Sequence, residues 1–116
     1  MNTQQLLELA AQSIDLDYEW RHDRYYGGQV GVVPKGYLRT WNPLTQNNDA
    51  VELIAKLRLN VNWGQWPNEQ DVVAVEQAIT GLGQIVEPVT DDPEIQLRQA
   101  VTRSAAQIQL EHNLND

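Results

Sequence analysis

Residues 41–50, WNPLTQNNDA, mark the place where an extended segment ends and a helix begins. Pro43 has no amide hydrogen to give to a strand ladder, and its ring keeps Asn42 out of the helical region of backbone space. The polar residues that follow are frequent at helix starts. We therefore predict that Trp41, Pro43 and Leu44 form a structural joint rather than a binding site.

Three segments carry apolar residues at the three- and four-residue spacing of a helix face. They are residues 4–13, 48–58 and 92–111. Asp49 with Glu52, and Asp91 with Glu94, match the capping-box spacing at the starts of the last two helices. Residues 112–116 continue no apolar stripe, so we expect this end of the chain to fray.

Four further segments have the alternating or β-branched pattern of strands. They are residues 15–20, 29–33, 59–64 and 71–76. A turn around Pro67 separates the last two, which predicts an antiparallel hairpin, and Ile85 with Val86 fits either a short edge strand or a loop. The predicted fold is α+β, with one antiparallel sheet packed against helices in the order α-β-β-α-β-β-α.

Length and composition indicate a single domain that spans residues 1–116. The chain has no cysteine, 41% hydrophobic residues and only short apolar runs, so disulfides, thiolate chemistry and a membrane span are not expected. The first residues, Met1 to Thr3, lead directly into a helical pattern without a signal-peptide pattern, which favours the cytoplasm.

The net charge of −8 is spread unevenly along the chain. No Lys or Arg occurs between Arg58 and Arg98. A nucleic-acid binder needs a basic stripe, so direct nucleic-acid binding is not expected. The acid excess has two interpretations, solubility or an acidic face for a basic partner, and the second rests mainly on Glu69, Asp71 and Glu76.

The residue pattern favours no catalytic, metal or cofactor site. Only two histidines are present, His22 and His112, and no zinc, calcium or phosphate-loop spacing occurs. Asp15 and Asp17 share one face of a predicted strand, where two carboxylates could hold a cation, but the solvent-facing side of any half-buried strand shows the same pattern. We therefore predict a protein that is not an enzyme and has no cofactor.

All eight aromatic residues are Trp or Tyr, the two types that are enriched at protein interfaces. We assign Trp20, Trp41 and Trp63 to the core. We predict contact roles for the remaining candidates, which lie in or beside turns: Tyr25, Tyr26 and Trp66.

The WNPLT phrase, followed by Asp49, Ala50 and an apolar helix, resembles the phage ABA sandwich domain family, small proteins of tailed phages and prophages. The segment from Asp92-Pro93 to Ile108 is similar to the family's closing helix. The resemblance implies helices packed on an antiparallel sheet, and it implies no activity.

These features together favour a small acidic phage or prophage protein that binds a host or phage protein without catalysis. A more specific form is an inhibitor of a host nucleic-acid or defence enzyme, whose phosphate groove would receive carboxylates. The alternatives are a structural or assembly component of the phage particle, for which a homo-oligomer is expected, and a small enzyme.

Overall fold

The computed structural model describes residues 1–22 and 30–115 and confirms the α+β fold class. Its elements follow the order α-β-β-α-β-β-β-α. They are α1 Thr3–Ser13, β1 Tyr18–Arg21, β2 Gly31–Pro34, α2 Asn47–Leu57, β3 Leu59–Gln65, β4 Asp71–Gln77, β5 Ile85–Pro88 and α3 Pro93–Leu114. Ile85 and Val86, whose pattern fitted either a strand or a loop, therefore lie in a strand, β5.

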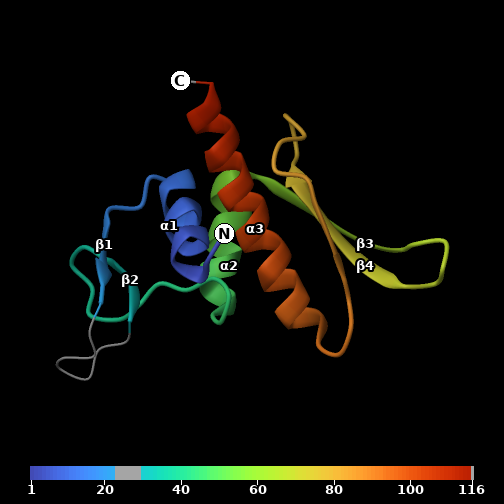
Figure 1. Cartoon of the computed structure of the whole chain (residues 1–116), viewed down its shortest axis with the longest axis horizontal. Helices are drawn as coiled ribbons and strands as arrows, with labels where there is room; N and C mark the ends of the chain where they lie inside the picture. Colours follow the sequence, from blue (N-terminus) through green and yellow to red (C-terminus); the bar gives the residue numbers. More distant parts are fainter. Residues whose placement is uncertain (23–29, 116) are drawn as a thin grey trace.

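The strands form two antiparallel sheets, whereas we expected one. One sheet pairs β1 with β2, and the other has the order β3-β4-β5. The three helices lie between the two sheets, with β1–β2 on one side and β3–β4 on the other (Figure 1). The expectation of one sheet was wrong because alternation predicts which residues form strands but does not specify their partners.

Helix α3 is the element that joins these parts, since it contacts α1, α2, β4 and β5. Its contact faces consist mainly of small residues: Ala100, Val101, Thr102, Ser104, Ala105 and Ala106 are all buried. Small side chains let neighbouring backbones approach closely, so one helix can be covered by helices on one side and by strands on the other. We expected fraying from residue 112, but the helix continues to Leu114.

The helix starts differ in detail from the sequence prediction. In α3 the cap is Asp92, one residue later than expected, and its side chain accepts a hydrogen bond from the Glu94 amide at 2.9 Å. Helix α2 has no side-chain cap: it begins at Asn47 after Gln46, so Asp49 lies within its first turn, and Asp49 and Glu52 bind the preceding joint.

The Trp41 joint is packed into the fold, and the assignment of Trp41 to the core is confirmed. Trp41 is 4% exposed, and its amide donates to the Val32 carbonyl at 2.8 Å, which extends the contact with β2. Pro43 is fully buried, and the Leu44 carbonyl accepts a hydrogen bond from Arg98 of α3 at 3.0 Å. The joint thus connects the smaller sheet to the central helix.

Gly83 lies where the loop before β5 crosses α3. Its carbonyl accepts a hydrogen bond from the buried Ser104 hydroxyl at 2.6 Å. A Cβ at this glycine would lie 2.6 Å from Ile108 Cγ1 and 2.7 Å from the Ser104 carbonyl oxygen. The φ angle of +68° is also one that side chains other than glycine rarely adopt.

Replacing Gly83 by alanine is expected to lower the free energy of unfolding by about 2–3 kcal/mol, through overpacking and backbone strain together. Gly36 is the matched control, because it also has a positive φ, of 86°, but no atom lies within 4 Å of its added Cβ. Gly36→Ala should cost only about 1 kcal/mol. Equal losses in urea unfolding would contradict close packing at Gly83.

Candidate functional site

The β3–β4 hairpin extends from the helical centre to one end of the molecule (Figure 1). Its turn is held by two backbone bonds: the Trp66 amide donates to the Gln70 carbonyl, and the Glu69 amide to the Trp66 carbonyl, both at 2.9 Å. Glu69 takes a left-handed backbone conformation there, with φ of 68°. The hairpin is therefore an ordered element with a defined tip.

The structure separates the three acidic candidates. Glu69 lies in the turn and Asp71 begins β4 beside it, where its carboxylate accepts a hydrogen bond from Gln65 Nε2 at 3.0 Å. Glu76 lies five residues after Asp71 on β4, which is about 17 Å along the strand. Because side chains alternate along a strand, Glu76 projects from the opposite face of the sheet. The hairpin tip thus carries Glu69 and Asp71, and Glu76 belongs to another surface.

The exposed aromatic side chains of the hairpin are Trp63 and Trp66, at 53% and 42% exposure. Trp66 was predicted as a contact residue, and its exposure leaves it accessible. Our assignment of Trp63 to the core was wrong. Val73, which lies opposite Trp63 in the ladder, is fully buried. Trp63 lies on the edge strand β3, where the rest of the chain covers only about half of its surface.

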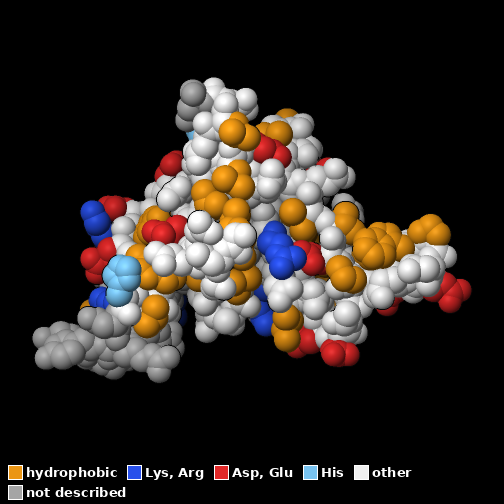
Figure 2. Space-filling view, viewed as in Figure 1, with side chains coloured by type: hydrophobic (Ala, Val, Ile, Leu, Met, Phe, Trp, Pro, Cys, Tyr) orange, Lys and Arg blue, Asp and Glu red, His pale blue; other side chains and the backbone are white. Residues whose placement is uncertain are grey.

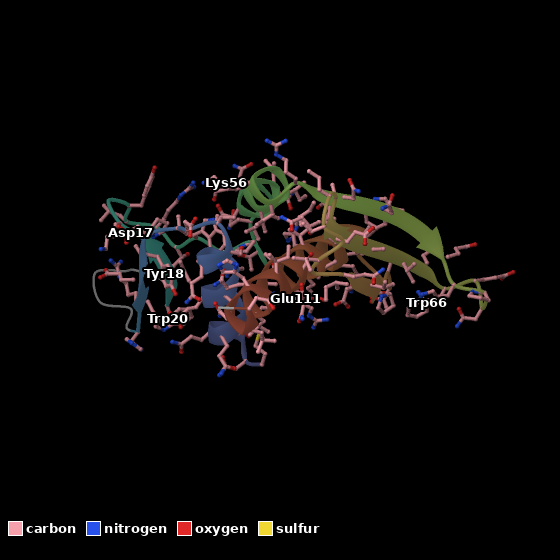
Figure 3. The ribbon with its side chains drawn as sticks, turned by 90° about the horizontal axis from the view of Figure 1, so that it is seen from above. Asp17, Tyr18, Trp20, Lys56, Trp66 and Glu111 are labelled. Carbon is pink, nitrogen blue, oxygen red and sulfur yellow. The ribbon has the colours of Figure 1, made fainter. Side chains whose placement is uncertain are left out.

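Tyr18 and Trp20 lie far from the hairpin (Figure 3). Trp66 lies at one end of the molecule, whereas Tyr18 and Trp20 lie at the other (Figure 3). Trp20 is half-buried against the core, which agrees with its assignment only in part. The candidates Tyr25 and Tyr26 fall outside the described residues.

The hairpin surface is acidic and apolar. Figure 2 shows hydrophobic and acidic side chains along the projecting hairpin, and no Lys or Arg there on the face in view. Within residues 59–97 the sequence has seven acids and no Lys or Arg. Glu87 of β5 is mostly buried and forms an ion pair with Arg103 of α3, so it serves the fold rather than this surface.

A second group of carboxylates holds the Trp41 joint. Glu52 accepts a hydrogen bond from the Trp41 indole at 2.8 Å and forms an ion pair with Lys56 at 2.9 Å. Partial burial acts to raise the pKa of Glu52, but the bonds from Lys56 and Trp41 outweigh it and lower that pKa below 4.5. Burial raises the pKa of the neighbouring Asp49, even though the Asn42 amide donates to it at 2.8 Å.

These pKa shifts predict a pH-dependent contribution to stability. Because the pKa of Glu52 is lower in the folded state, its contribution is present above the unfolded pKa and is lost as pH falls through the folded pKa. Glu52→Gln should therefore lower the free energy of unfolding at pH 7, and the difference from the parent should shrink below about pH 4. Asp49 acts in the opposite sense, but it is present in both proteins and largely cancels.

Urea unfolding of both proteins at pH 7 and at about pH 3.5 measures this difference. An equal difference at the two pH values would contradict an ionised Glu52 at the joint.

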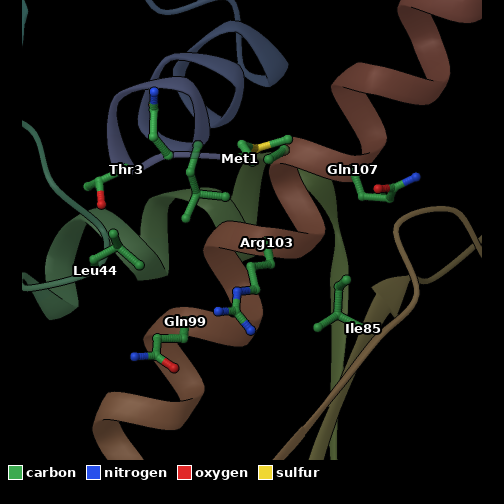
Figure 4. Close-up of a pocket in the computed structure, with 10 residues that line it drawn as sticks. Met1, Thr3, Leu44, Ile85, Gln99, Arg103 and Gln107 are labelled. Carbon is green, nitrogen blue, oxygen red and sulfur yellow. The ribbon is translucent and has the colours of Figure 1, made fainter.

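Among the described residues, hollows of about 520 and 420 Å³ lie away from the hairpin. Figure 4 shows the first, between the start of α1, the middle of α3 and Ile85 of β5. Among the described residues that line it, Arg103 is the one charged side chain, and it already pairs with Glu87. The second hollow lies over the joint and includes Trp41, Asp49 and Glu52. The acids of this second hollow are those that bind the joint, so neither hollow offers a free acid–base pair.

No group of three or more His, Asp or Glu side chains suited to a metal ion occurs in residues 1–22 and 30–115. Over the same residues, no helix combines the length and apolar character that crossing a membrane requires.

Comparisons of the chain with protein-family models, with curated proteins and with solved structures found no match. The geometry of the hairpin is therefore the basis on which a function can be argued.

Proposed function

We propose that this chain is a non-catalytic protein-binding module that uses the tip of its β3–β4 hairpin to bind a basic surface of another protein. The observation that carries the proposal is the hairpin itself, which carries the exposed Trp63 and Trp66 together with Glu69 and Asp71 and has no Lys or Arg in its strands. Exposed indoles bordered by charges are typical of interaction sites, and carboxylates favour a basic partner.

The likeness of the WNPLT stretch to phage ABA sandwich proteins supports a more specific form of the proposal. The chain would then be an accessory protein of a phage or prophage that acts in the host cytoplasm on a host or phage protein. A nucleic-acid or defence enzyme suits the charge argument, because a groove built for phosphates attracts carboxylates on a projecting hairpin.

The test begins with affinity purification from host cells and continues with the purified partner. Glu69→Lys should weaken binding about tenfold at low salt, and the loss should shrink as salt is added, because exposed charges are screened. Glu76→Lys is the matched control, since it changes the net charge equally but lies on the other face of the sheet.

Equal effects of the two variants would contradict a site at the tip. Recovery of phage particle proteins alone, with no sensitivity to Glu69, would instead favour the structural role.

A further inference from the structure

Strand β3 has a partner on one side only. Its sheet has the order β3-β4-β5, and within residues 1–22 and 30–115 no strand pairs with the other edge of β3. Helix α2 ends at Leu57, just before β3 begins at Leu59, and contacts this strand. The segment from Val61 to Gln65 is therefore the part of this edge that leads away from the helices.

The register shows which backbone groups face the open side. At the two ends of the hairpin the Ala78 amide donates to the Arg58 carbonyl and the Trp66 amide to the Gln70 carbonyl. In an antiparallel ladder every second residue bonds to the partner strand, so even-numbered residues of β3 bond to β4. The N–H and C=O groups of Val61, Trp63 and Gln65 consequently point away from the sheet.

This edge lacks the features that usually prevent pairing with another chain. Proteins protect edge strands with lysine and other charges, proline, bulges or short length. The sequence of β3, LNVNWGQ, is seven residues long and contains neither a charged residue nor a proline. Its register with β4 is unbroken from Leu59 to Gln65, so no bulge interrupts it.

The charges around the edge select the kind of chain that would pair with it. Asp71 lies opposite Gln65 on the face that also carries Trp63. An added strand would lie about 5 Å from β3 and about 10 Å from β4. The second distance is about equal to the Debye length at 0.1 M salt, so the charges of β4 would still act on the added strand. A Lys or Arg on that strand would approach both the Asp71 carboxylate and the exposed indole, and both attract cations.

A second copy of the chain is a poorer occupant for the same reason. It would bring a net charge of −8, and a further base-free hairpin, against the first. Like charges across an interface oppose association.

We propose that the open edge of β3 binds an extended, basic segment of the partner protein as an added antiparallel strand. This inference rests on the proposed function and specifies how the partner binds. The backbone groups of Val61, Trp63 and Gln65 supply the affinity, and Trp63 with Asp71 selects lysine or arginine on the facing side.

A direct probe is a ten-residue peptide that alternates valine and lysine, titrated against the full chain and followed by tryptophan fluorescence. The lysines should lie on the Trp63 face, so their amides should bond to β3. N-methylation of the lysine amides should weaken binding at least tenfold, whereas N-methylation of the valine amides should leave it nearly unchanged. Equal binding of the two methylated peptides, or equal binding when glutamate replaces lysine, would overturn the proposal.

A pair of protein variants tests the same edge. Gln65→Pro removes an amide that points to the open side and no ladder bond to β4, and proline is tolerated at such positions. Gln65→Ala is the control, because both variants lose the bond to Asp71. Only the proline variant should lose peptide binding tenfold or more, and similar binding by both would overturn strand addition.

The outcomes separate this inference from the function on which it rests. A natural partner whose binding is lost in Glu69→Lys and kept in Gln65→Pro would sustain the proposed function and overturn the edge mechanism. Sedimentation that shows a dimer, dissociated by Gln65→Pro, would place a second copy on the edge and overturn the basic occupant.

Discussion

The close packing of α3 is the constraint on which the rest of this structure depends. A helix with larger side chains at Ala100, Ser104 and Ala105 would hold its neighbours further away. The backbone at Gly83 already lies so close to α3 that an added Cβ would be 2.7 Å from the Ser104 carbonyl oxygen. Because these positions are small, α3, a helix of 22 residues, packs against α1 and α2 and also against β4 and β5. Arg98 on the same helix also reaches the Trp41 joint, which orders the connection to α2.

This arrangement explains why the hairpin is exposed. The helix covers the inner face of the larger sheet along the central strand β4 and the strand β5, and Val73 and Val75 of β4 are buried there. Strand β3 forms the outer edge of that sheet, so Trp63 keeps half of its surface in water although it alternates with residues of the core. A large indole at this position keeps much of its apolar surface in water and contributes little buried area to the fold. Exposed apolar surface of this kind is typical of a binding site.

The sequence predicted the helices and most strands because their patterns are local. Apolar spacing placed α1 and α2 within one residue of their observed bounds, and the alternation of β3 and β4 predicted their hairpin. The smaller sheet of β1 and β2 packs against α1, and no local pattern encodes such a tertiary contact. Alternation likewise placed Trp63 on the inward face but could not show that this face is uncovered at the edge. Asp49 and Glu52 have capping spacing, but α2 begins earlier, at Asn47, and both side chains bind the Trp41 joint.

Among the described residues, β3 has an open edge, and amide hydrogen exchange measured residue by residue in the free protein can establish whether water reaches it. An open edge gives alternating protection, with slow exchange at Asn60, Asn62 and Gly64, which bond to β4, and fast exchange at Val61, Trp63 and Gln65. Uniformly slow exchange along β3 in the isolated chain at low concentration would instead mean that the edge is already covered, and would rule out an open edge.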